Sequence, residues 1–550
     1  MNTMICNDTL WGAAWFSWYD FSITDSVLVV GEVSRSALNE LGLRFKSVSM
    51  FSWQDDYEES NFSAIIVFGG LGTWQTNKNF LSVVNKALSP QGVLLWAVDN
   101  KLGTRFLCGD GHITDEGDYF TRAEWEMLFR TSAMPLWRVW GIMPDWRLAR
   151  NIFTDEYSLS CDMMQRLELY YAEPSKLFRN EKELLRDLAE CGNWAFFANS
   201  FLLEYRMDEI DKEVRYVDMS PDKGRTAASV LMYYAGDYVE KKPLFFGGTV
   251  SQIYHYGEEL RKRGLAFVEQ KYADGRIEMP YMAAPLLSTK LKEAAERSVQ
   301  EFRKLMDQLW TCILDSSAES AQSNFPDNGM DCGVILTKAY LDMIPTNVFV
   351  VDSRFVFFDQ EYCCDNYPAK YVLYRALVTL YNAEPEISAF IPQKKVQEWF
   401  ELTTIWPVFQ KADSNFVWRV RNWGLYKDIY TKHIINTHSL ERNKCLLERI
   451  DKVVKSDLFA ALNDREIVIF GAGASCDKYL REYGMLHRPK FIVDNNENKW
   501  HTFKQGIEIF APTVLADKEA DALRVIICSR FVEEIGKQLQ SMGIDDYRVY

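Results

Sequence analysis

The chain has 550 residues, of which 48% are hydrophobic and 25% are charged. This composition is typical of a globular protein, and the length predicts about three or four domains. A formal net charge of −15 argues against a general binder of nucleic acid or of anionic membranes. The 11 cysteines are odd in number and lack zinc-site spacing, which favours a reducing cytoplasm over a disulfide framework. No apolar run of about 18 residues is present, so we expect no transmembrane helix.

The first part of the chain alternates between strand and helix patterns. Buried strands are predicted over residues 26–31, 64–68 and 93–98, with helices over 34–41 and 77–88. This alternation predicts an open α/β sheet, in which ligands bind beyond the carboxyl ends of the strands. The turn after the first strand contains one glycine, Gly31, instead of a glycine-rich run.

The block from Asp99 to Gly109, with Tyr119–Glu124 and Phe197–Leu202, resembles class I S-adenosylmethionine-dependent methyltransferases of a bacterial, glycan-associated branch. The resemblance implies a methyltransferase-like domain over residues 1–205. It also implies cofactor binding at Gly31, Asp99 and Asn100. Ser63 follows Gly31 by only 32 positions, which leaves little room for a complete second strand, helix and third strand. A non-catalytic relative therefore stays open as an alternative.

The next part of the chain, residues 206–450, begins with strand patterns at 225–234 and 238–241. A helix follows from Gly247, and then a hairpin over 266–281. This order matches the first lobe of a kinase, where a strand lysine binds phosphate and pairs with a glutamate on the next helix. Lys241 is the predicted phosphate-binding residue, with Glu258 or Glu259 as its partner. Lys242 is the alternative, because side chains alternate between the two faces of a strand.

A second group of polar residues surrounds an apolar hairpin farther along the chain. Asp342 and Asn347 precede the hairpin, and Asp359 follows it. Phosphoryl transfer needs a carboxylate beside the attacking hydroxyl, with an amide oxygen and a second carboxylate on Mg²⁺. The alternative is a surface turn before a hairpin, which the same residue types favour. Residues 288–314 are predicted to form a helix with an apolar stripe.

With Tyr371–Leu377, this second group resembles the aminoglycoside-phosphotransferase-like branch of kinases. The resemblance implies Asp342 as the catalytic base or orienting residue, and Asn347 and Asp359 as ligands of Mg²⁺ beside ATP. Two positions depart from the pattern: Tyr340 stands where histidine is common, and Gln360-Glu361 replaces Phe-Gly.

The last part of the chain, residues 451–550, contains a strand at 466–470 followed by Gly471 and Gly473, and then Asp494 at the end of the next strand. Glycines at a helix N-terminus admit a phosphate, and the carboxylate takes ribose hydroxyls. The segment resembles Rossmann-like modules of bacterial sugar-modifying proteins, which implies a site for NAD(P) or a nucleotide sugar. An empty βαβ unit that serves in docking is the alternative.

The sequence thus predicts an α/β multidomain protein with a Rossmann-like methyltransferase sheet, an α+β kinase-like bilobal domain and a small C-terminal Rossmann-like α/β domain. The leading functional hypothesis is a cytoplasmic ATP/Mg²⁺-dependent phosphotransferase acting on a sugar or glycan precursor in bacterial surface-polysaccharide biosynthesis. One alternative is an S-adenosylmethionine-dependent methyltransferase of a glycan precursor with a kinase-like scaffold. The other is a non-catalytic assembly protein. We expect a small-molecule or glycan substrate, glycan-assembly proteins as partners and no nucleic acid.

Overall fold

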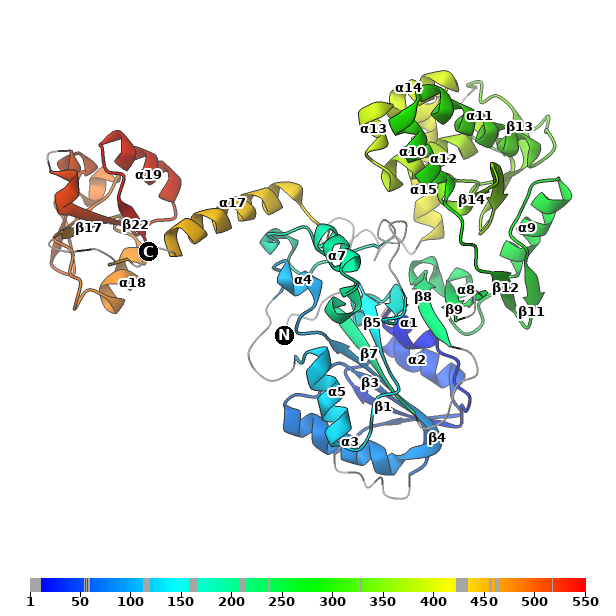
Figure 1. The fold of residues 1–550 in the computed structure, drawn as a ribbon, viewed down its shortest axis with the longest axis horizontal. Coiled ribbons are helices and arrows are strands. Elements are labelled where there is room, and N and C mark those ends of the chain that lie inside the picture. The colour runs from blue at the N-terminus through cyan, green and yellow to red at the C-terminus, as the bar shows by residue number, and fades with distance from the viewer. Residues whose placement is uncertain are drawn as a thin grey trace. The chain divides into compact units, whose positions relative to one another are not determined.

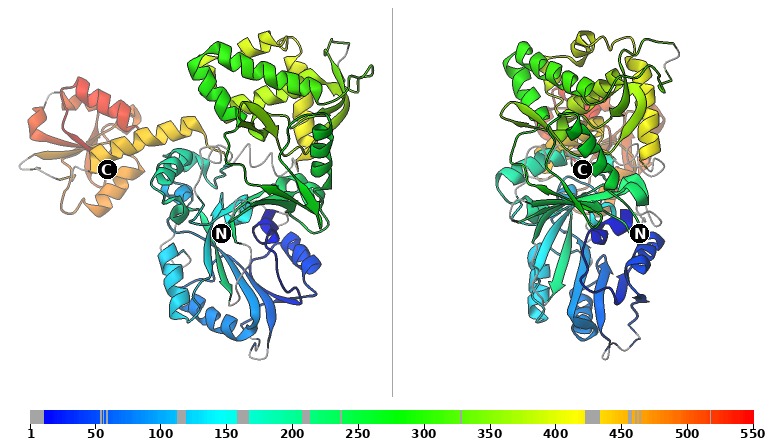
Figure 2. Two further views of the ribbon diagram at one scale, coloured as in Figure 1. Left: turned by 45° about the vertical axis from the view of Figure 1, so that its right-hand side comes forward. Right: turned by 90° about the vertical axis from the view of Figure 1, so that its right-hand side faces the viewer.

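The computed structural model describes residues 11–53, 55, 57, 60–111, 119–157, 167–206, 213–235, 238–326, 329–421, 434–454, 458–459, 462, 465–516 and 518–550. The chain forms two compact units, residues 1–440 and 441–550, and their elements are shown in Figures 1 and 2. In the described ranges, no helix is both long and apolar enough to cross a membrane.

A sheet of twelve strands runs through the larger unit. Its order is β11-β12-β10-β9-β8-β6-β5-β7-β4-β3-β1-β2. The strands are β1 Ser26–Gly31, β2 Ser47–Met50, β3 Phe62–Phe68, β4 Leu88–Asp99, β5 Arg138–Met143, β6 Asn151–Phe153, β7 Ser200–Arg206, β8 Val214–Met219, β9 Ser229–Tyr234, β10 Tyr238–Pro243, β11 Lys271–Ala273 and β12 Arg276–Pro280.

The end of this sheet formed by the first part of the chain is parallel from β2 through β1 and β3 to β4, after which β7 pairs antiparallel with β4. Val27 and Val29 of β1 pack into one apolar cluster, whereas Leu28 and Val30 pack into another. Both faces of β1 are therefore covered, which explains its continuous apolar run. Helices α2 (Arg35–Arg44) and α3 (Trp74–Ala87) follow β1 and β3. The predicted open α/β sheet is confirmed here, and the short β2 fits the limited chain length after Gly31.

The sheet continues without a break into the segment expected to be kinase-like. Strand β8 pairs with β6 on one side and with β9 on the other. Strands β9, β10, β12 and β11 then form an antiparallel series. The predicted boundary at 205/206 therefore lies within one sheet, and the division into three domains stays a prediction.

Helices cover the rest of the larger unit around one apolar core. The helix predicted over 288–314 is two helices, because Ser298 is extended and its side chain caps the second one. The main helices here are α9 Ser251–Lys262, α10 Leu287–Arg297, α11 Val299–Asp315, α12 Ala369–Ala383, α14 Gln393–Trp399 and α15 Trp406–Val420. Two small hairpin-like pairs accompany them, β13 Ile335–Tyr340 with β16 Cys363–Pro368 and β14 Val348–Val351 with β15 Arg354–Phe357.

The smaller unit contains a six-stranded sheet of order β19-β20-β18-β17-β21-β22. Its other four pairings are parallel, and β19 is antiparallel to β20. The predicted strand–helix alternation is confirmed for this unit. Helix α17, Thr437–Val454, spans the boundary between the two units. Elements of the smaller unit include β17 Glu466–Phe470, α18 Ala474–Glu482, β18 Phe491–Val493, β19 Phe503–Lys504, β20 Ile507–Phe510, β21 Leu523–Ile527, α19 Val532–Ser541 and β22 Tyr547–Val549.

Candidate functional site

A cavity of about 470 Å³ in the larger unit, called the cleft below, lies between strands β9, β10 and β12 and the loop after β15. Apolar side chains and seven charged ones line it together. A concave cavity that brings polar groups together is a candidate small-molecule site. The charged lining residues are Arg150, Asp218, Lys223, Lys241, Asp359, Glu361 and Arg421, and the apolar ones include Val239, Phe349 and Phe358.

Strand β10 decides which of its two neighbouring lysines reaches the cleft. Val239 and Lys241 line the cleft, whereas the ammonium group of Lys242 lies 2.5 Å from Asp20 Oδ1. Alternation along the strand places the two lysines on opposite faces. The structure therefore places Lys241, and not Lys242, in the lining of the cleft, and the choice of Lys241 as the phosphate-binding residue stays a prediction.

The predicted pairing of Lys241 with a helix glutamate is wrong. Glu258 lies 2.6 Å from Arg261 Nη1. Glu259 accepts hydrogen bonds from Lys338 Nζ at 2.7 Å and from the Tyr340 hydroxyl at 2.7 Å. Helix α9 thus directs both carboxylates to partners other than Lys241.

Lys241 instead pairs with two carboxylates from the segment after β15. Its ammonium group donates to Asp359 Oδ1, and to Glu361 Oε1 at 2.7 Å. Glu361 stands where the resemblance to kinases implies glycine, and its side chain supplies the carboxylate that helix α9 does not. Although burial lowers the pKa of Lys241, the two carboxylates raise it above its usual value.

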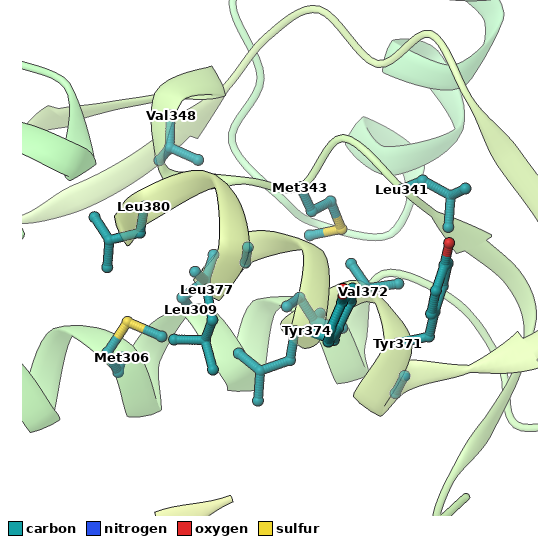
Figure 3. Close-up of a cluster of buried hydrophobic side chains, with 14 of the residues drawn as sticks. Met306, Leu309, Leu341, Met343, Val348, Tyr371, Val372, Tyr374, Leu377 and Leu380 are labelled. Atoms are coloured by element: carbon teal, nitrogen blue, oxygen red, sulfur yellow. The ribbon is translucent and has the colours of Figure 1, made fainter. Parts of the chain in front are cut away.

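The loop that carries Asp342 packs against the apolar core through the two residues that flank it. Leu341 and Met343 are fully buried, and they lie over helix α12 near Tyr371 and Val372 (Figure 3). Because both neighbours of Asp342 are fixed in the core, the backbone of the loop has little freedom at this position.

Asp342 joins this loop to the segment that carries Asp359. Its Oδ2 accepts hydrogen bonds from the backbone amides of Glu361 at 3.0 Å and Tyr362 at 2.9 Å. Its backbone carbonyl accepts from Gln360 Nε2 at 2.9 Å and from Asn347 Nδ2 at 3.3 Å. The structure therefore brings together the residues that the spacing predicts to be neighbours.

The side chain of Asp342 is only 10% exposed. Burial raises its pKa, Arg375 lowers it and Glu361 raises it further, and the result is a value of about 6. A carboxylate with a pKa near the working pH is suited to accept a proton.

Asn347 and Asp359 offer the oxygen atoms that a magnesium site requires. The amide nitrogen of Asn347 donates to the backbone carbonyl of Asp359 at 3.3 Å, which holds the two residues side by side. The Asp359 side chain is 34% exposed. Across the described ranges, no group of three or more His, Cys, Asp or Glu side chains gathers as a metal site. Two hard oxygen donors still fit Mg²⁺, which takes its other ligands from phosphates and water.

Gly31, Asp99 and Asn100, the candidate cofactor-binding residues of the first part of the chain, make contacts with other residues of the chain. At Gly31, whose φ is +91°, a Cβ atom would overlap the carbonyl oxygen of Phe68 on the neighbouring strand. Asp99 pairs with Arg147 through both carboxylate oxygens at 3.0 and 2.9 Å, and accepts from Ser200 Oγ at 3.1 Å. The Asn100 side chain donates to the carbonyl of Ala198 at 2.8 Å. The cofactor role of these residues stays a prediction.

In the smaller unit, a carboxylate of the same unit accepts a hydrogen bond from the backbone of the glycine turn. Asp494 Oδ2 accepts from the Ala472 amide at 2.7 Å and lies 2.9 Å from Lys499 Nζ. Gly471 has a φ of +107°, and a Cβ there would lie 2.8 Å from the carbonyl of Cys528, whereas Gly473 at the start of α18 faces open space. The carboxylate expected to bind ribose is therefore turned toward the glycine turn. Binding of NAD(P) or a nucleotide sugar stays a prediction.

Among the charged residues of the cleft that the sequence did not predict as site residues are Lys223 and Glu361. Lys223 ends the short 3-10 helix η4 (Pro221–Lys223) and donates to Glu361 Oε2. No motif marks Lys223. The replacement of glycine by Glu361 was visible in the sequence, and the appearance of a charge at that position was the available signal.

Comparison with known proteins gives one match to a family model. The model described as "C2185-like, N-terminal" matches residues 463–550, which lie in the smaller unit. No curated protein matches the chain.

Solved structures similar to part of the chain include methyltransferases. A methyltransferase from Mesorhizobium loti shares 10% identity and a TM-score of 0.21 over 36% of this chain and 99% of that chain. A putative methyltransferase complex with the Trm112 activator of Haloferax volcanii shares 12% identity and a TM-score of 0.23 over 36% of this chain and 91% of that chain. The mitomycin 7-O-methyltransferase MmcR shares 12% identity and a TM-score of 0.18 over 24% of this chain, which spans about half of that enzyme, 49%. Because these identities and TM-scores are low, we base the functional proposal on the geometry of the site.

Proposed function

We propose that the cleft binds ATP with Mg²⁺ and that the protein is a phosphotransferase. The observation that supports this proposal is the meeting of Lys241 and Asp359 in the lining of one cleft, with Asn347 and Asp342 hydrogen-bonded to the segment that carries Asp359. These are the residue types that phosphoryl transfer requires, because its catalysis consists mainly of positioning and charge stabilisation. When bound, Mg-ATP supplies the phosphoryl group that is transferred.

Each residue has a role that its contacts allow. The ammonium group of Lys241 binds phosphate oxygens in exchange for its present carboxylate partners. The side-chain oxygens of Asn347 and Asp359 hold the metal. Asp342 orients the acceptor hydroxyl and takes its proton on a carboxylate oxygen, for which its raised pKa is suited.

The acceptor in this proposal is a sugar or glycan precursor for bacterial surface polysaccharide, with glycan-assembly proteins as partners in the cytoplasm. This assignment rests on the family resemblances of the chain and on its net charge of −15, which argues against a nucleic-acid substrate.

A thermal-shift measurement on the full chain tests the nucleotide proposal. A ligand that binds only the native state raises the melting temperature, by an amount that grows with ligand concentration. We expect Mg-ATP to raise it, and ATP with EDTA to raise it less. An unchanged melting temperature at millimolar Mg-ATP would contradict the proposal.

A second candidate function is S-adenosylmethionine-dependent methyl transfer, with the kinase-like part as a scaffold. The solved structures similar to part of the chain are methyltransferases, whereas the geometry of the cleft favours the first candidate. Isothermal titration with S-adenosylmethionine tests it, and binding that Asp99→Ala abolishes without loss of folding would support it. A chain that binds neither ATP nor S-adenosylmethionine would be the non-catalytic assembly protein.

A further inference from the structure

The cleft contains a second lysine, Lys223, which lies outside the strands and loops that carry the expected kinase-like residues. Lys223 lies in the connection between β8 and β9, as the last residue of η4, and Gly224 follows it with a φ of +78°. Its side chain is only 18% exposed, and it lines the cleft together with Lys241 and Glu361. A buried ammonium group needs a neighbouring negative charge. The partner that supplies this charge in the structure is therefore the group that an anionic ligand can replace.

One carboxylate holds both lysines. Glu361 Oε1 accepts from Lys241 Nζ at 2.7 Å, and Glu361 Oε2 accepts from Lys223 Nζ. The two ammonium groups are therefore separated only by the width of one carboxylate and two hydrogen bonds. A phosphate group has a similar size and presents more oxygen atoms, so it can take the place of the carboxylate between them.

The two lysines and the carboxylates that form ion pairs with them balance in charge without a ligand. Lys223 and Lys241 face Glu361 and Asp359, two cations against two carboxylates. Arg150 and Arg421 also line the cleft, but they pair with Glu168 and Asp222. When Asp359 takes a metal ion, Lys241 loses one of its two partners, and a phosphate chain restores the balance.

We propose that Lys223 is a second phosphate-binding residue of the cleft, and that Glu361 holds Lys223 and Lys241 in place until the phosphate chain of a nucleoside triphosphate replaces it. The inference rests on the proposed function, because it takes the ligand of the cleft to be a nucleotide. It adds a binding residue from the sheet turn after β8, outside the lysine and loop residues that the family resemblance implies.

Isothermal titration on the full chain tests the inference with two ligands. Mg²⁺ with β,γ-imido ATP carries the phosphate chain and is not turned over, and adenosine lacks phosphate. The variants are Lys223→Met and the matched control Lys242→Met, whose ammonium group pairs with Asp20 away from the cleft.

We expect Lys223→Met to weaken binding of the imido analogue by at least roughly tenfold, as loss of a charge-assisted hydrogen bond does. Its adenosine binding should be unchanged, and Lys242→Met should bind both ligands as the wild type does. Equal weakening of both ligands would show a merely structural role and overturn the inference. Unchanged binding of the analogue would overturn it too, while the proposed function stood.

Glu361→Gln provides an independent readout if Lys223→Met does not fold. Glutamine keeps the shape of the side chain but no longer competes as an anion for the two lysines. We expect tighter binding of the imido analogue and unchanged binding of adenosine. Unchanged or weaker binding of the analogue would overturn the inference. A wild-type chain that binds neither ligand would overturn the proposed function along with it.

Discussion

Two aspartates at strand ends of the larger unit have opposite environments. Asp99 is the last residue of β4, and its side chain is 9% exposed. Both of its carboxylate oxygens are held by Arg147, and Ser200 adds a further hydrogen bond. Asp359 follows β15 and is 34% exposed at the cleft, where its described side-chain partner is a lysine. The first carboxylate is committed to the fold, whereas the second can exchange its partner for a metal ion.

The two aspartates are alike in their position at the end of a strand but differ in whether their carboxylates are available to a ligand. Both aspartates lie where ligands of α/β sheets and of phosphotransferases are expected. Only the contacts of the folded chain show whether the carboxylate is already satisfied by neighbouring cations and donors. Substitution at each residue therefore tests a different property, activity at Asp359 and stability at Asp99.

The largest effect is expected for Asp359→Asn. The change removes a metal-binding charge and should lower Mg-dependent ATP turnover by roughly a thousandfold or more, at ~1.4 kcal/mol per tenfold. The fold should persist because Lys241 keeps Glu361 as a partner. Steady-state ATP turnover and a thermal melt of the same preparation measure both effects. Turnover equal to that of the wild type would contradict the metal assignment.

The change Asp99→Asn should instead lower stability without removing nucleotide binding. Although burial raises the pKa of Asp99, Arg147 lowers it below its usual value, so the charged form is favoured in the fold. Loss of the charge leaves Arg147 poorly compensated and should cost about 2 kcal/mol, less than a fully buried pair because Arg147 is partly exposed. Urea denaturation followed by tryptophan fluorescence measures it.

An exposed ion pair provides the control for Asp99. Asp25 and Lys46 lie 2.5 Å apart but are 63% and 79% exposed, so Asp25→Asn should leave the urea midpoint unchanged. Equal midpoints for Asp99→Asn and Asp25→Asn would contradict the structural role of Asp99.

The pH dependence of turnover tests the environment of Asp342. With a pKa of about 6, Asp342 is a carboxylate at pH 7 and becomes protonated as the pH falls. The protonated form cannot take a proton from the acceptor, so kcat/KM should fall by about tenfold between pH 7 and pH 5. The measurement is a pH–rate profile with Mg²⁺ in excess. A profile that stays flat down to pH 5 would contradict the role of Asp342 as a base.

The sequence predicted the elements and the neighbours better than it predicted the partners. Runs of apolar residues predicted the strands. The spacing of Asp342, Asn347 and Asp359 predicted that they lie close together, because a short hairpin returns the chain to its starting point. The partner of Lys241 was mispredicted because the family pattern places it on helix α9, whereas Glu361 supplies it here. Lys223 was missed because it reaches the cleft through the pairing of β8 with β9, which no local pattern encodes.

The smallest effects are expected for the helix glutamates that the sequence favoured as partners of Lys241. Glu258→Gln breaks a partly exposed pair with Arg261 one helical turn away, which should cost only about 0.3 kcal/mol. Because neither Glu258 nor Glu259 holds Lys241, titration with Mg²⁺ and the imido analogue should give wild-type affinity for Glu258→Gln and for Glu259→Gln. A loss of affinity in either variant, with Glu361→Gln unaffected, would show that the nucleotide-bound protein uses the helix glutamate after all.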